Sequence, residues 1–277
     1  LESVVASLED ETEIVVVDDG SRDGTVEAVR SLARAASTRA RPIRVVENAT
    51  NLGVSGARNA GIAAASGDVV LFTDSDCVVD PDWLRAYLAA FERRPGMGAA
   101  SGLVEEPTPT TLAELAYGGS GAIGRSAAQR RRLMGCNMAF RTAVLRAING
   151  FDPLYRAAGD DVDACWRLMD QGHLIGFDAA MFVWHHRRNT VKAYLRQQNG
   201  YGRAEALLAP KHHERFNALG NSRWAGRIYG DISGHTLTVR PIIYHGVFGN
   251  GLFQTLYEPR ASLFSHLPLS FEWIMAA

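Results

Sequence analysis

Residues 13–21, Glu13-Ile14-Val15-Val16-Val17-Asp18-Asp19-Gly20-Ser21, read EIVVVDDGS and decide the fold class. A continuous β-branched run that ends on turn residues predicts a strand buried on both faces. Such strands are typical of the parallel sheets of α/β proteins. The two acids therefore stand at the carboxyl end of a strand, which is where open α/β sheets bind their ligands.

Outward from this strand, helical and extended patterns alternate along the chain, and this alternation predicts a doubly wound, mostly parallel sheet. Helical patterns cover 25–36, 56–66, 81–94, 161–172 and 190–208; extended patterns cover 13–17, 43–49, 68–74 and 179–188; residues 135–148 read as a strand that turns into a helix. Asp80 and Pro81 predict the start of the helix at 81–94. Pro and Thr residues near 100–111 indicate a crossing segment.

Composition restricts the class of protein. The 277 residues are 47% apolar, and 29 basic residues balance 30 acidic ones, so the overall charge gives no reason to expect a nucleic-acid partner. Cys77, Cys136 and Cys165 form no CxxC pair and are interpreted as small buried hydrophobes of a reducing compartment. Because neither a signal peptide nor an apolar run of about 18 residues is visible, we expect a cytoplasmic protein.

Asp74 and Asp76, in the stretch LFTDSDCVVD (71–80), place two carboxylates close together after an apolar run. An EF-hand loop is excluded because its Gly and Glu positions hold Val79 and Arg85. Surface acids and a metal-diphosphate site both remain compatible with the pattern. One or two carboxylates on a rigid strand end are what a divalent ion on a nucleotide diphosphate needs from a protein.

The segment Gly119–Gly124, GSGAIG, matches the G-x-G-x-x-G pattern of dinucleotide-binding proteins. That pattern should follow a buried strand and open a helix. Here the preceding residues read as helical and the following ones are polar and basic. The context therefore favours a loop over a dinucleotide site.

Four ordered stretches together resemble the successive motifs of family 2 glycosyltransferases, which are inverting enzymes with the GT-A fold. They are VVVDDGSRDGT (15–25), NLGVSGARNAGIAAASGDVVLFTDSDCVVDPDWL (51–84), GCNMAFRTAVLRAINGFD (135–152) and GDDVDACWRLMDQGH (159–173). The resemblance implies that the usual first strand of the fold lies upstream of Leu1. It also implies a nucleotide-sugar half at 1–105, an acceptor and catalytic half at 106–190, and a C-terminal helical extension at 191–277.

The resemblance also implies the donor-site residues. Asp19 corresponds to the acid that hydrogen-bonds the base of the sugar nucleotide, and Asp18 is its neighbour. Arg58 matches a position near the nucleotide and its diphosphate. Asp74 and Asp76 form the D-x-D motif, in which the first acid lies near the ribose or sugar and the second binds Mg or Mn.

The resemblance also implies roles for residues farther along the chain, after residue 105. Asp161 corresponds to the general base, although the residues by themselves favour acids that complement and cap a helix start. Asp160 departs from the usual Glu, keeps its charge, and is a candidate for acceptor contact. His185 is expected to complete the metal site. The stretch around Gln198 and Tyr201 departs from the Gln-containing helix of processive members, and these two residues are candidates for acceptor or donor contacts.

Taken together, the sequence predicts a metal-dependent enzyme that moves a sugar from a nucleotide-diphosphate donor, most simply a UDP-sugar, to a hydroxyl acceptor such as a glycan or lipid. A sugar nucleotidyltransferase and a non-catalytic nucleotide-sugar-binding domain are the alternatives. The apolar C-terminal segments are compatible with packing on the domain or with association at the inner face of the cell membrane.

Overall fold

The computed structural model describes residues 1–9, 12–39, 41–105, 133–186 and 190–216, together with four two-residue strands farther along the chain. The chain divides into two compact units, one formed by Leu1–Pro107 and Ala122–His186 and the other by Thr108–Gly121 and Arg187–Ala277. The expected three-part division stays a prediction. The segment 119–124 with the G-x-G-x-x-G pattern lies outside the described residues.

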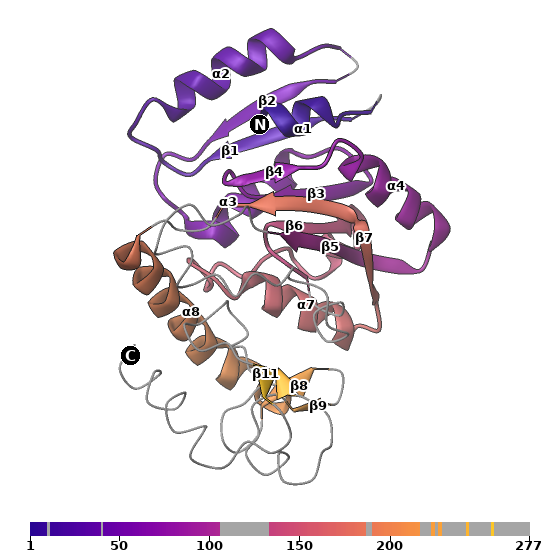
Figure 1. Cartoon of the computed structure of the whole chain (residues 1–277), viewed down its shortest axis with the longest axis vertical. Coiled ribbons are helices and arrows are strands. Elements are labelled where there is room, and N and C mark those ends of the chain that lie inside the picture. Colours follow the sequence, from indigo (N-terminus) through magenta and orange to yellow (C-terminus); the bar gives the residue numbers. More distant parts are fainter. Residues whose placement is uncertain are drawn as a thin grey trace. The chain divides into compact units, whose positions relative to one another are not determined.

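The first unit begins with a two-stranded parallel sheet that confirms a strand at 13–17, although only Ile14 of β1 is buried and its other residues are half-buried, because the sheet has only two strands. Its elements are α1 (Glu2–Ala6), β1 (Ile14–Asp18), α2 (Thr25–Ala36), β2 (Ile43–Glu47) and α3 (Gly53–Ala64). The two strands pair in register from Ile14 opposite Ile43 onward. Ile14, Ala33 and Ile43 form a buried core between the strands and α2, which lies along this small sheet in Figure 1.

A five-stranded sheet with the order β3-β6-β5-β7-β4 forms the rest of this unit. The strands are β3 (Val69–Thr73), β4 (Cys77–Val79), β5 (Met97–Glu105), β6 (Asn137–Arg141) and β7 (Leu174–His185), and the helices are α4 (Trp83–Arg93), α6 (Thr142–Ala147) and α7 (Asp160–Asp170). The α/β class is confirmed, but the strands run in both directions. Strand β6 lies antiparallel between β3 and β5, β4 is antiparallel to β7, and β5 and β7 are parallel.

Two local expectations were wrong. Residues 97–105 form the nine-residue strand β5 and not the start of a crossing segment, because its first six residues are all small or apolar and all buried. Helix α4 begins at Trp83 with Asp82 as its N-cap residue, so Asp80 does not cap it. The Asp80 carboxylate instead accepts a hydrogen bond from the Asp82 N–H (2.9 Å) in the preceding turn.

Asn137, at the start of β6, is fully buried and joins four elements of this unit. Its Oδ1 accepts hydrogen bonds from Trp83 Nε1 (2.9 Å) and from the Tyr87 hydroxyl (2.8 Å). Its Nδ2 donates to the carbonyls of Leu103 (3.1 Å) and Met181 (2.7 Å). One amide therefore satisfies polar groups of α4, β5 and β7 that burial would otherwise leave unpaired.

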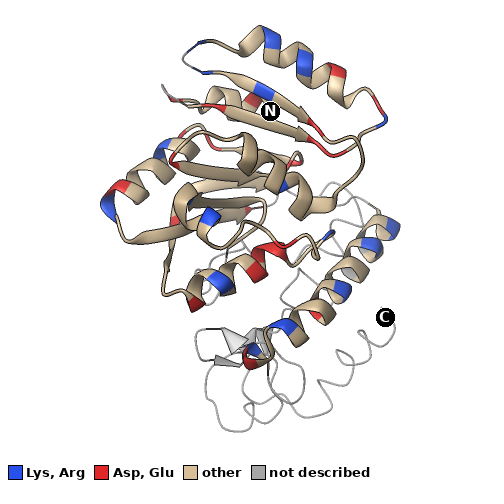
Figure 2. Cartoon of the chain, turned by 180° about the vertical axis from the view of Figure 1, so that it is seen from behind, with Lys and Arg blue, Asp and Glu red and all other residues tan. Residues whose placement is uncertain are grey.

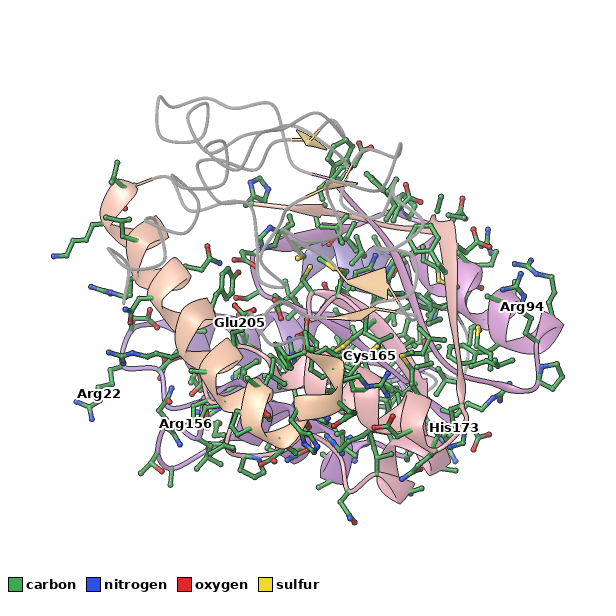
Figure 3. The ribbon with its side chains drawn as sticks, turned by 90° about the horizontal axis from the view of Figure 1, so that it is seen from below. Arg22, Arg94, Arg156, Cys165, His173 and Glu205 are labelled. Atoms are coloured by element: carbon green, nitrogen blue, oxygen red, sulfur yellow. The ribbon has the colours of Figure 1, made fainter. Side chains whose placement is uncertain are left out.

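The second unit contains α8 (Val191–Lys211), as expected for 190–208, followed by the short helix η2 (His213–Arg215) and β8–β11 (Arg223–Trp224, Arg227–Ile228, Ile242–Ile243, Leu256–Tyr257). The Thr190 hydroxyl caps α8 by accepting from the Ala193 N–H (3.3 Å). Burial raises the pKa of Glu205, which lies on this helix (Figure 3), to about 7. Within the described residues, no helix combines the length and the apolar character that crossing a bilayer requires.

Replacing Asn137 with Ala should lower the free energy of unfolding by at least about 3 kcal/mol, because three buried groups and the half-buried Leu103 carbonyl lose their hydrogen bonds at once. Urea denaturation measures this change. Asn48→Ala is the matched control, since among the described residues the Asn48 amide makes one side-chain hydrogen bond, to the Asp19 carboxylate; a smaller cost of about 1.5 kcal/mol is expected there, because the acceptor is charged. Equal effects of the two substitutions would contradict the role of Asn137.

Candidate active site

The acids at the end of β1 bind the backbone around them. Asp18 Oδ2 accepts from the N–H groups of Gly20 (3.1 Å) and Ser21 (3.0 Å), which closes the turn after the strand. Hydrogen bonding from Ser21 lowers the pKa of Asp18. Asp18 therefore shapes the loop and stays ionised over the neutral pH range.

Asp19 follows β1, and its side chain reaches the start of α3, where the carboxylate accepts three hydrogen bonds. Its Oδ1 accepts from Asn48 Nδ2 and the Leu52 N–H (both 2.8 Å), and its Oδ2 accepts from the Gly53 N–H (2.8 Å). Burial raises the pKa of Asp19, but these hydrogen bonds outweigh burial and lower it overall. A carboxylate offers about four acceptor positions, so one remains for a ligand. The assignment of Asp19 to the nucleotide base stays a prediction.

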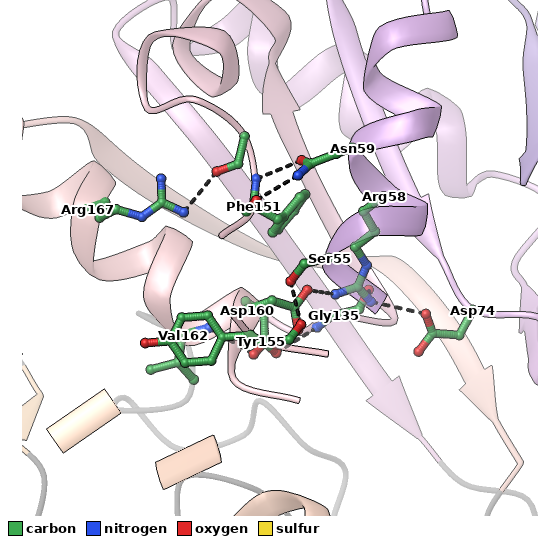
Figure 4. Close-up of polar contacts among 12 residues, drawn as sticks. Ser55, Arg58, Asn59, Asp74, Gly135, Phe151, Tyr155, Asp160, Val162 and Arg167 are labelled. Atoms are coloured by element: carbon green, nitrogen blue, oxygen red, sulfur yellow. Dashed lines mark hydrogen bonds and ion pairs between the residues drawn. The ribbon is translucent and has the colours of Figure 1, made fainter. Parts of the chain in front are cut away.

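Arg58, on α3, connects three other parts of this unit (Figure 4). Its Nη1 donates to Asp160 Oδ2, and its Nη2 donates to Asp74 Oδ1 (3.2 Å) and to the Gly135 carbonyl (2.9 Å). The Arg58 side chain is only 10% exposed. Burial lowers its pKa, but the carboxylates of Asp160, Asp74 and Asp161 reverse this and raise it, so the guanidinium is always charged.

Asp160 and Asp161 open α7, where Figure 2 shows acidic residues gathered in the first helical turn. The Asp160 side chain is 3% exposed and faces Arg58. Burial raises the pKa of Asp160 to about 6; Arg58 opposes this effect and Asp161 adds to it. Contact of Asp160 with an acceptor stays a prediction, and its buried pairing with Arg58 favours a positioning role.

Asp161 is held from two directions. Its Oδ2 accepts from the Gly135 N–H (3.0 Å) and its Oδ1 from the Val162 N–H (2.8 Å). Gly135 thus donates to Asp161 through its N–H and accepts from Arg58 through its carbonyl. No local sequence pattern predicts this double contact, which depends on the backbone path before β6.

The D-x-D turn and the end of β7 lie together, as the resemblance implied. Cys77 is directly opposite His185 in the β4–β7 pair, and His185 Nε2 lies 3.7 Å from Asp76 Oδ1. The backbone fixes this arrangement, because the His186 N–H donates to the Asp76 carbonyl (3.0 Å). Two ligands that are each about 2.1 Å from an ion are at most about 4.2 Å apart, so the oxygen and nitrogen fit a shared divalent cation.

The loop between α6 and α7 is clamped by α3 on one side and by α7 on the other (Figure 4). Ser55 Oγ donates to the Tyr155 carbonyl (2.6 Å), and the Asn59 amide exchanges two hydrogen bonds with the Phe151 backbone (2.7 and 2.9 Å). From α7, Arg167 Nη2 donates to the Gly150 carbonyl (2.8 Å). This loop leads directly to Asp160, so these hydrogen bonds fix the position of Asp160 and Asp161 at the start of α7.

Gln198 and Tyr201 lie on α8 in the second unit. The site described above consists only of residues of the first unit. A contribution of Gln198 or Tyr201 to donor or acceptor binding stays a prediction.

Residues 1–148 match the family profile described as Glycosyl transferase family 2. The match covers more than half of the 277 residues. The chain belongs to glycosyltransferase family 2. This confirms the family that the four sequence motifs indicated.

Among curated proteins, this family 2 member is similar to a pre-mycofactocin glycosyltransferase of Mycobacterium tuberculosis, with 28% identity over 215 residues. The match covers 74% of this chain and 44% of the mycobacterial protein, so the chain spans less than half of that relative's length.

Solved structures confirm the GT-A fold. The mannosyltransferase PcManGT from Pyrobaculum calidifontis, in complex with GDP-Man and Mn²⁺, matches with a TM-score of 0.59 and 20% identity, over 76% of this chain and 59% of that one. S. aureus TarS in complex with UDP-GlcNAc matches with a TM-score of 0.55 and 18% identity, over 75% and 61%. At sequence identities this low, the similarity to these structures supports the fold of this family 2 member and nothing further.

Replacing Gly135 with Ala should impair transfer, because a Cβ there would lie 2.9 Å from Arg58 Nη2 and 3.4 Å from Asp161 Oδ2. We expect the rate constant to fall about tenfold or more as these groups shift. Gly96→Ala is the matched control, since no atom lies within 4 Å of a Cβ at Gly96. Equal rates in both variants, measured with saturating donor, would contradict the contact.

The transfer rate should fall on the acid side with an apparent pKa of about 6, where Asp160 takes up a proton. Protonation removes the charge that orients the Arg58 guanidinium, so activity should fall below this pH; because the pKa of Asp160 is raised on folding, the fold itself is not destabilised by this proton uptake. Rate profiles against pH for Asp160→Asn should lack this acid limb; an unchanged limb would assign it to another group.

Proposed function

We propose that this protein is an inverting glycosyltransferase that moves a sugar from a nucleotide-diphosphate donor, most simply a UDP-sugar, to a hydroxyl acceptor. The observation that carries the proposal is the Arg58 guanidinium, which joins Asp74 of the D-x-D turn to Asp160 beside Asp161. A donor-binding acid and the acids at the start of α7 are thereby held in one rigid arrangement. Transfer requires this juxtaposition, because donor and acceptor must meet in a defined geometry.

Asp161 is the general base in this proposal. It is partly exposed, and two backbone N–H groups orient its carboxylate. Inverting transfer needs one carboxylate to remove the acceptor's hydroxyl proton as that oxygen attacks the anomeric carbon from the face opposite the diphosphate. Asp160 is occupied by Arg58, so Asp161 is the acid of this pair that remains available to the acceptor.

Asp76 and His185 would hold a divalent cation, Mg or Mn. Such a cation supplies positive charge that stabilises the leaving nucleoside diphosphate. The complex of the similar mannosyltransferase with GDP-Man and Mn²⁺ supports this part of the proposal. Arg58 adds a permanent positive charge next to Asp74. Asp74 is proposed to contact the sugar or ribose of the donor, and Asp19 is proposed to contact its base.

The acceptor is proposed to be a glycan, a lipid or a cell-envelope precursor. The place of action is proposed to be the cytoplasm, at or near the inner face of the cell membrane. Gln198 and Tyr201 on α8 are proposed contacts for donor or acceptor. UDP-GlcNAc, the ligand of the similar TarS structure, supports a UDP-sugar as the first donor to test.

Asp161→Asn should lower the transfer rate constant by about 10²–10⁴-fold, because the amide cannot accept the acceptor's proton. Donor affinity should change little, and calorimetric titration with nucleoside diphosphate measures it separately. Asp170→Asn, an exposed acid at the other end of α7, is the matched control and should keep full activity.

The product identifies the reaction class. Sugar transfer releases a nucleoside diphosphate, whereas a sugar nucleotidyltransferase releases pyrophosphate. Undiminished turnover of the Asp161→Asn variant would contradict the assignment of the base, and pyrophosphate release would contradict the proposed reaction.

A further inference from the structure

A thiol faces the pair of residues assigned to the cation. Cys77 follows the D-x-D motif directly and is paired with His185 across the β4–β7 ladder. Directly opposed residues of antiparallel strands place their side chains on the same face of the sheet, with Cβ atoms about 4.5–5.5 Å apart. The Cys77 sulfur, an Asp76 carboxylate oxygen and a His185 ring nitrogen all lie within 4.8 Å of one another.

Burial alone does not distinguish this cysteine from the others. Cys77 is 7% exposed, and it belongs to a core cluster that also contains Val79 and Cys136. Cys165 is buried as well, on α7 (Figure 3), yet within the described residues it joins no group of three His, Cys or acidic side chains. The interpretation of all three cysteines as small hydrophobes therefore accounts for Cys165 but not for the convergence at Cys77.

The site around Cys77 is also accessible to an ion. The side chains of His185 and Asp76 are 22% and 25% exposed, so the carboxylate and the imidazole border the solvent while the sulfur forms the inner wall. Ligands at about 2.0–2.3 Å from an ion are separated by up to about 4.4 Å. Because the three atoms lie within 4.8 Å of one another, a shift of at most a few tenths of an ångström brings them into this range.

We propose that Cys77 is a third protein ligand of this cation and that it makes the site select thiophilic transition-metal ions, such as Zn²⁺ or Co²⁺, over Mg²⁺. The inference rests on the proposed function, because it concerns the same cation site. Mg²⁺ is bound almost entirely by oxygen, whereas thiolate and imidazole favour zinc and similar ions. The thiol proton passes to the solvent as the sulfur–metal bond forms.

The test is a titration of the full chain with Co²⁺, because a cobalt–thiolate bond gives a charge-transfer absorption in the near ultraviolet that oxygen and nitrogen ligands do not give. The wild-type protein should show the band, and Cys77→Ser should lose it. The double variant Cys136→Ser/Cys165→Ser keeps Cys77 as its only cysteine, since the sequence contains three. This double variant should retain the band. Its result tests the proposal even if Cys77→Ser fails to fold.

Affinity measurements give a second readout that does not depend on catalysis. Calorimetry should show that Cys77→Ser weakens Zn²⁺ binding about tenfold or more while Mg²⁺ binding is unchanged. Co²⁺ binding that requires Asp76 and His185 but gives no sulfur band would overturn this inference and leave the proposed cation site intact. Failure of every divalent ion to bind would overturn both.

Discussion

The buried ion pair between Arg58 and Asp160 is the interaction on which the rest of the site depends. A buried guanidinium left without its carboxylate costs about 3–5 kcal/mol, so neither partner tolerates loss of the other. Arg58 also binds Asp74 and the Gly135 carbonyl, and it therefore fixes β3, the turn before β6 and the start of α7 relative to α3. Asp74 and Asp160 are thus positioned by one cation that belongs to the protein itself.

Local sequence patterns predicted the elements that local physics determines. The β-branched run at 14–17 and the amphipathic pattern of α2 fold as expected, and the acids lie at strand ends, because burial and periodicity act over a few neighbouring residues. Strand β4 was not predicted. Its three residues are too few for a periodic signal, and they are extended because Cys77–Val79 pair with β7 more than a hundred residues later.

Long-range polar contacts were also invisible in the sequence. Ser55, Arg58 and Asn59 occupy positions i, i+3 and i+4 of α3, a spacing that normally predicts a solvated face. Here that face binds the loop between α6 and α7 and the acid at its end. Asn137 reads as a polar interruption of a strand, and only the packed structure shows that its partners come from three other segments. The meeting of Asp76 with His185 was likewise expected from the family resemblance and not from spacing.

Helix α3 also fixes the distance between the Asp19 carboxylate and the Arg58 guanidinium. It begins beneath the Asp19 carboxylate at Gly53 and carries Arg58 five residues later, which corresponds to about 7.5 Å along the helix axis. The acid expected to meet the base and the cation beside the D-x-D turn are thus separated by a rigid spacer. One residue added or removed within it would rotate the guanidinium by about 100° around the axis, away from both carboxylates. The number of residues in this segment is therefore constrained as strictly as the identity of the charged residues at its ends.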